Sequence, residues 1–171
     1  AYDGKLAFYD AEEEVCVGVL VFAERYRRLE KKMAVQEKDP CRKVELTAIS
    51  RVLARVPAQP ASSFHEALQM VWLMQLIPQI ESNGFSISLG RLDQYCWPYL
   101  KADLAAGTIT LEQAQELLDL LWLKFCEILR VDSRDAAEVN AGYYVAGQNI
   151  EVGGVDRGGH DCTNLLSYLC L

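Results

Sequence analysis

The stretch ESNGFSISLGRLDQY, Glu81 to Tyr95, contains side chains that could bind a small polar molecule. It follows a strongly apolar helix, is rich in Ser, Asn and Gly, and carries Arg91 and Asp93, charges that cannot be buried without partners. Hydroxyl and amide groups held at a rigid helix end suit small polar ligands, but buried polar networks use the same groups. The residues alone leave both interpretations open, a ligand pocket and an internal polar network.

Other patterns that would indicate metal or phosphate chemistry are weak. No CxxC or HxxxH spacing occurs, and His160 with Cys162 is the only close pair of zinc-type ligands, so we predict no metal site. The glycines of GGVDRGGHD, residues 153–161, are not followed by GK[ST] and do not form GxGxxG. This segment favours a turn with Asp156 and Arg157 facing solvent over a phosphate cradle.

Composition predicts one globular core in a cytoplasmic protein. The chain has 171 residues, 51% of them hydrophobic, and a net charge of -7, which disfavours nucleic acid and anionic lipid as partners. It shows no signal peptide and no uninterrupted apolar span of ~18 residues, so we predict no membrane segment. Six scattered cysteines without a secretory signal indicate reduced thiols, with Cys16, Cys126 and Cys170 in the core.

Apolar periodicity predicts a mostly helical chain. We expect helices at about residues 5–33, 40–56, 64–79, 92–106 and 111–130, and a short strand at about 148–152. Asp39 with Pro40, and Thr110 with Gln113, are helix start signals. The third of these helices is apolar on nearly every side, so we expect other protein to cover it.

Five stretches resemble the glycyl radical enzymes, the pyruvate formate-lyase-like family of formate acetyltransferase, glycerol and propanediol dehydratases, choline lyase and related decarboxylases. They are AERYRRLEKKM (23–33), RVPAQPASSFHEALQMVW (55–72), QIESNGFSISLGRLDQY (79–95), GTITLEQAQELLDLLWLKFCEI (107–128) and QNIEVGGVDRGGHDCTNLLSYLCL (148–171). They occur in the family's order. The resemblance covers nearly the whole chain and implies that the chain is one internal segment, residues 1–171, of a pyruvate formate-lyase-like domain.

The resemblance implies a mostly α-helical fragment of an α/β glycyl radical enzyme barrel. In that family a glycyl radical passes to a cysteine, and the resulting thiyl radical takes a hydrogen atom from the substrate. The family's G-C-x-E and R-V-x-G-Y/F loops do not occur here, so no catalytic or cofactor-binding residue is assigned and the isolated chain is expected to be inactive. The full enzyme implies anaerobic radical cleavage of C–C or C–X bonds, an iron-sulfur, S-adenosylmethionine-dependent activating partner, and a homodimer.

Matching the family motif position by position assigns three substrate-binding candidates. Ser86 matches a serine that bonds substrate polar groups in dehydratases, and Tyr143 falls where the family has another pocket-lining side chain. Phe85 stands where diol dehydratases often have histidine, which argues against a glycerol-type substrate and suits an apolar or cationic one. The alternative hypothesis is a non-catalytic helical module, derived from such an enzyme, that binds a partner protein through an exposed apolar helix.

Overall fold

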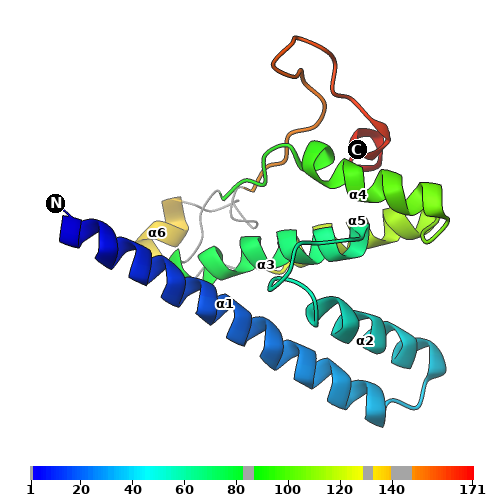
Figure 1. Cartoon of the computed structure of the whole chain (residues 1–171), viewed down its shortest axis with the longest axis horizontal. Coiled ribbons are helices and arrows are strands. Elements are labelled where there is room, and N and C mark those ends of the chain that lie inside the picture. Colours follow the sequence, from blue (N-terminus) through cyan, green and yellow to red (C-terminus); the bar gives the residue numbers. More distant parts are fainter. Residues whose placement is uncertain (1, 83–86, 129–132, 140–147) are drawn as a thin grey trace. The chain divides into compact units, whose positions relative to one another are not determined.

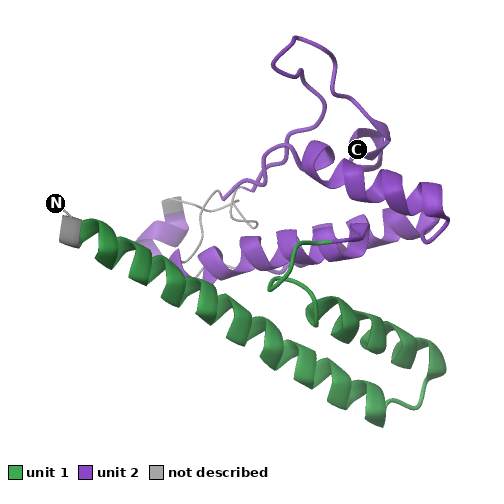
Figure 2. Cartoon of the chain, in the orientation of Figure 1, with its two compact units in different colours: residues 1–61 green, residues 62–171 purple. Residues whose placement is uncertain are grey.

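The computed structural model describes residues 2–82, 87–128, 133–139 and 148–171. The chain divides into two compact units, residues 1–61 and 62–171, where composition had led us to expect one core (Figure 2). No helix in the described ranges combines the length and apolar character needed to cross a membrane.

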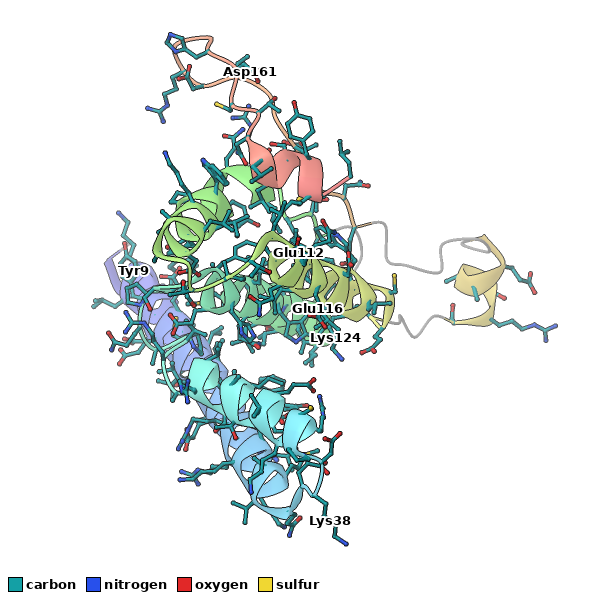
Figure 3. The ribbon with its side chains drawn as sticks, turned by 90° about the vertical axis from the view of Figure 1, so that its right-hand side faces the viewer. Tyr9, Lys38, Glu112, Glu116, Lys124 and Asp161 are labelled. Atoms are coloured by element: carbon teal, nitrogen blue, oxygen red, sulfur yellow. The ribbon has the colours of Figure 1, made fainter. Side chains whose placement is uncertain are left out.

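The first unit is a helical hairpin. Helix α1 (Tyr2–Gln36) and helix α2 (Pro40–Leu53) run antiparallel, with Lys38 in the turn between them (Figures 1 and 3). The Asp39 carboxylate caps α2 by accepting a 3.0 Å hydrogen bond from the Cys41 amide, and Pro40 occupies the first turn, as the sequence predicted. Because α2 is much shorter than α1, only part of α1 is covered within this unit.

The described part of the second unit contains five helices. They are α3 (Phe64–Ser82), α4 (Leu92–Ala106), α5 (Leu111–Cys126), α6 (Arg134–Val139) and α7 (Leu165–Leu169). Helix α3 packs against α4 and α5, and α7 packs against α4. The core side chains Phe64, Leu92, Leu100, Leu118 and Leu166 are fully buried. Burial of such side chains is the main favourable term in holding the cluster together.

Two of the predicted helix ends have the expected caps. Thr110 and Gln113 form a reciprocal capping box at the start of α5, and Gly107 ends α4 in the left-handed conformation at φ 67°. At the start of α3, the Glu66 carboxylate accepts a 2.7 Å hydrogen bond from the Ser62 amide, and the Ser63 hydroxyl accepts a 3.2 Å hydrogen bond from the Glu66 amide.

The strand expected at residues 148–152 does not form in the described structure. One isolated parallel bridge joins Gly90 to Ile150, flanked by hydrogen bonds from Leu89 to Asn149 (3.2 Å) and from Glu151 to Gly90 (2.9 Å). We call residues 87–90 and 148–151 the parallel pair. A longer ladder is interrupted because the chain turns away just after it, at two glycines with positive φ.

The prediction that three cysteines are core thiols was wrong for two of them. Cys16 and Cys126 are exposed and Cys170 is half-buried, whereas Cys96, which the pattern did not single out, is fully buried. Cys16 lies on the part of α1 that α2 does not reach. All six cysteines are free thiols.

Candidate functional site

The three predicted substrate-binding residues, Ser86, Phe85 and Tyr143, lie outside the described residues. Segments on either side of them are described, and their contacts can be followed. On one side the description resumes at Ile87, and on the other at Gln148. These two residues begin the two halves of the parallel pair.

Two glutamines lie on one face of α3, and the first of them contacts the segment that begins at Ile87. Gln75 is 2% exposed, and its Nε2 donates a 2.7 Å hydrogen bond to the Ile87 carbonyl. Gln79, one helical turn later on the same face, is 5% exposed, yet neither its Oε1 nor its Nε2 has a hydrogen-bond partner among the described residues. The amide of Gln148 is also buried, and in the described part of the chain it has no hydrogen-bond partner.

Unpartnered buried amides are costly, at about 1–3 kcal/mol each, so native proteins rarely keep them without another group to bond. Gly90 pairs with Ile150 in the parallel pair, and the same register places Gln148 opposite Ser88. Ser88 is two residues after Ser86 in the sequence. The described residues therefore provide unused donors and acceptors on Gln79 and Gln148, on segments that adjoin the candidate pocket residues.

Asp93 fixes the far end of the predicted pocket segment. Its side chain is fully buried in the first turn of α4, and its Oδ2 accepts hydrogen bonds from the Gly153 amide at 2.6 Å and the Ser167 hydroxyl at 2.5 Å. Its carbonyl accepts from the Asn164 side chain at 3.2 Å. We call this set of bonds the Asp93 latch. It ties α4 to the loop of residues 153–164 and to α7.

Arg91 and Gln94 extend this attachment. Arg91 donates to the Val155 carbonyl at 3.0 Å and to Gln94 Oε1 at 3.1 Å, and Gln94 donates to the Gly153 carbonyl at 2.5 Å. Of the two interpretations that the sequence left open, the internal polar network is therefore correct for Arg91 and Asp93. Each of these side chains has one partner in the loop of residues 153–164 and another in a helix, Gln94 of α4 for Arg91 and Ser167 of α7 for Asp93. The loop stands off the helices with Asp161 near its tip (Figure 3).

The buried thiols near the latch are not nucleophiles at neutral pH. Burial raises the pKa of the Cys96 thiol to about 12 and that of Cys170 to about 11. Because only the thiolate attacks carbon or sulfur, a thiol with so high a pKa is inert near pH 7. Within the described ranges, no group of three or more His, Cys, Asp and Glu side chains could hold a metal ion.

Sequence reasoning missed the residues that hold the candidate segment in place. Gln75 was hidden inside an apolar helix, where one polar side chain facing the core is itself a signal of a buried hydrogen bond. Ser167 and Asn164 form a capping box at the start of α7, a spacing that could have been recognised. Their additional bonds to Asp93 span more than 70 residues and leave no local pattern.

Comparison with known proteins places this arrangement in a family. The family model described as "Pyruvate formate lyase-like" matches residues 1–171. The chain is 38% identical over 169 residues to isethionate sulfite-lyase from Nitratidesulfovibrio vulgaris, covering 98% of this chain and 20% of that protein. The chain thus spans about a fifth of the length of this curated relative.

Solved structures agree in fold. A glycyl radical enzyme from Archaeoglobus fulgidus superimposes with a TM-score of 0.89 at 36% identity over 95% of this chain and 21% of that one. A second solved structure, described as 1,2-propanediol dehydration in Roseburia inulinivorans, superimposes with a TM-score of 0.83 at 45% identity. This match covers 91% of this chain and 19% of that one. The helices described above therefore correspond to a helical part of that barrel fold, and the chain belongs to the pyruvate formate lyase-like family, the glycyl radical enzymes.

Proposed function

We propose that this chain is the helical scaffold and part of the substrate-pocket wall of a glycyl radical lyase or dehydratase. In that enzyme Ser86, Tyr143 and Phe85 would contact a small substrate whose C–C or C–X bond is cleaved by radical chemistry supplied by other segments. A thiyl radical would remove a hydrogen atom from the substrate, and this chain's part would be to bind and orient the substrate. The chain alone would be inactive.

The parallel pair is the observation that supports this proposal. Two parallel segments run in the same direction, so their first described residues, Ile87 and Gln148, lie at the same end of the pair. Ser86 directly precedes Ile87, and Tyr143 lies five residues before Gln148. The pairing of described residues thus favours a common location for both candidate side chains.

The substrate would be a small molecule with at least one polar oxygen. The Ser86 hydroxyl and the Gln79 and Gln148 amides would each offer a donor and an acceptor, which matches hydroxyl groups well. Relatives named for isethionate and for 1,2-propanediol fit this class. The full enzyme would work anaerobically in the cytoplasm as a homodimer, with a radical-installing iron-sulfur partner.

A chimera tests the pocket role. Residues 1–171 would replace the matching stretch of the N. vulgaris isethionate sulfite-lyase, and the chimera would be activated anaerobically and checked for its radical by electron paramagnetic resonance. We expect Ser86→Ala to lower kcat/KM tenfold or more with the radical content unchanged, because a transition-state hydrogen bond is lost.

The matched control is Ser82→Ala, since the Ser82 hydroxyl is exposed and donates only to the Pro78 carbonyl of its own helix at 2.6 Å. This control should leave kcat/KM unchanged. An unchanged kcat/KM for Ser86→Ala would show that Ser86 does not bind the substrate and serves only in packing. A chimera that carries the radical but turns over no substrate would count against this segment as a compatible pocket wall.

A further inference from the structure

Side chains continue the parallel pair at the point where its backbone ladder stops. The two segments run side by side as far as the bridge between Gly90 and Ile150 (Figure 1). The first segment then turns into α4 at Leu92, so its backbone no longer runs alongside the second segment. Any further connection between the two segments must come from side chains.

Asp93 and Gln94, neighbours in the first turn of α4, both bind the backbone of Gly153. The Gly153 amide donates to Asp93 Oδ2 at 2.6 Å, and Gln94 Nε2 donates to the Gly153 carbonyl at 2.5 Å. One side chain thus supplies the acceptor and the next supplies the donor that a neighbouring strand would offer. We call these two hydrogen bonds the Gly153 clamp.

The conformation of Gly153 suits this arrangement. Its φ is 68°, in the region that L-residues rarely adopt, and an added Cβ would lie 2.9 Å from the Thr163 Oγ1. A slip of one residue between the segments would break both clamp bonds and the 3.0 Å bond from Arg91 to the Val155 carbonyl. The clamp therefore fixes a register that one isolated bridge would specify only weakly.

The polar side chains at the start of α4 serve other segments more than their own helix. The N-cap residue, Arg91, makes no side-chain capping bond. The Asp93 carboxylate is fully buried and bonds to Gly153 and Ser167, both outside α4. Burying a carboxylate is costly unless hydrogen bonds compensate, so this position favours a role in holding those segments.

We propose that Asp93 and Gln94 are positioning residues for substrate binding. By holding Gly153 they set the register of the parallel pair, and the register aligns the substrate-contacting residues at the start of its two segments. The inference rests on the proposed function, which assigns Ser86 to the pocket. A misplacement of about 1 Å in a binding group can lower a reaction rate by about a hundredfold, so the register matters for catalysis.

Gln94→Glu, made in the chimera with isethionate sulfite-lyase, is the main test. The new carboxylate still accepts from Arg91, as the amide does at 3.1 Å, but it cannot donate to the Gly153 carbonyl. We expect kcat to fall about tenfold or more and KM to change by less than about threefold, because the bound substrate is misaligned. The radical content, measured by electron paramagnetic resonance, should stay unchanged.

Asp93 offers a comparison between a conservative and a disruptive variant. Asp93→Asn keeps an oxygen that can accept from the Gly153 amide, so kcat should stay within about threefold of the unmodified chimera. Asp93→Leu has a similar size but no acceptor, and kcat should fall about tenfold or more. If Asp93→Leu does not fold, Gln94→Glu alone decides.

The matched control is Thr110→Ala, which removes the capping box of α5 and lowers stability at a position remote in sequence from the clamp. This control should leave both kcat and KM unchanged. A fall in kcat for Gln94→Glu that an equal fall in radical content explains would make the clamp purely structural and would overturn the proposal.

Hydrogen exchange separates failure of the clamp from failure of the pocket. The Glu151 amide donates to the Gly90 carbonyl at 2.9 Å, and its exchange should be about tenfold faster in Gln94→Glu but not in Thr110→Ala. Mass spectrometry of a peptide that covers residues 149–153 measures this rate.

The outcomes are distinct. Unchanged exchange or unchanged kcat in Gln94→Glu would overturn the clamp as a positioning device, whatever Ser86→Ala does. Faster exchange and lower kcat in Gln94→Glu, together with an unchanged kcat/KM in Ser86→Ala, would support the clamp and count against the proposed role of Ser86.

Discussion

The Ser167 hydroxyl donates a 2.5 Å hydrogen bond to the buried carboxylate of Asp93, 74 residues earlier in the chain. The same carboxylate oxygen receives the Gly153 amide, so one side chain fastens α4 to both a loop and α7. A fully buried carboxylate that holds two separate segments is expected to matter for stability well beyond its own helix.

Removing the latch carboxylate should destabilise the second unit strongly. Asp93→Ala leaves the Gly153 amide and the Ser167 hydroxyl buried without acceptors, so we expect the free energy of unfolding to fall by about 3 kcal/mol. Ser167→Ala should cost less, about 1–2 kcal/mol, because Gly153 keeps its partner. Urea unfolding of both single variants and the double variant measures this. If the two losses simply add, the residues are not coupled.

Gly154 should resist substitution more than Gly159. Both have positive φ, 81° and 80°, which L-residues adopt at a cost of about 1 kcal/mol. A Cβ on Gly154 would also lie 2.8 Å from the Arg91 Nη2, whereas a Cβ on Gly159 meets nothing within 4 Å. We expect Gly154→Ala to lower the thermal midpoint more than Gly159→Ala. Equal shifts would mean that Arg91 moves aside freely.

Replacing either of two glutamines one helical turn apart by leucine should change the free energy of unfolding in opposite directions. Gln75→Leu leaves the Ile87 carbonyl without the hydrogen bond from Gln75 and should destabilise the chain by about 1–2 kcal/mol. Gln79→Leu removes an amide that has no hydrogen-bond partner in the described ranges and should stabilise the chain by a similar amount. The free energies of unfolding in urea decide the matter. Destabilisation by Gln79→Leu would show that this amide has a bonding partner in solution.

Stability should fall with pH above about 9 because of Cys96. Its pKa is raised from 9.0 to about 12 by burial, so the unfolded thiol loses its proton first while the folded thiol keeps it. The unfolded state then binds fewer protons, and stability declines by about 1.4 kcal/mol per pH unit between these values. Urea unfolding from pH 7 to 10 measures the slope, and Cys96→Ala should remove this contribution. An identical slope in that variant would contradict a buried, protonated thiol.

Local signals predicted five of the seven described helices. The cap residues Asp39 and Thr110 lie where their short-range chemistry indicated, because each acts on backbone groups within a few residues. The family relationship was also readable, since it rests on contiguous stretches such as residues 79–95.

Long-range partnerships could not be read in advance. The choice between pocket and network for Asp93 depended on Gly153 and Ser167, which only the fold brings near it. The exposure of Cys16 depended on how far α2 extends along α1, which no pattern around Cys16 encodes. The pocket roles of Ser86, Phe85 and Tyr143 stay predictions.

The wide sequence separation of the latch has a kinetic consequence. The bond from Gly153 to Asp93 closes a loop of about 60 residues, and such closures are slow compared with the formation of helices. We therefore expect α3, α4 and α5 to form early and the parallel pair to assemble last. Refolding should end with a late step in which the segments flanking Ser86 and Tyr143 become ordered together.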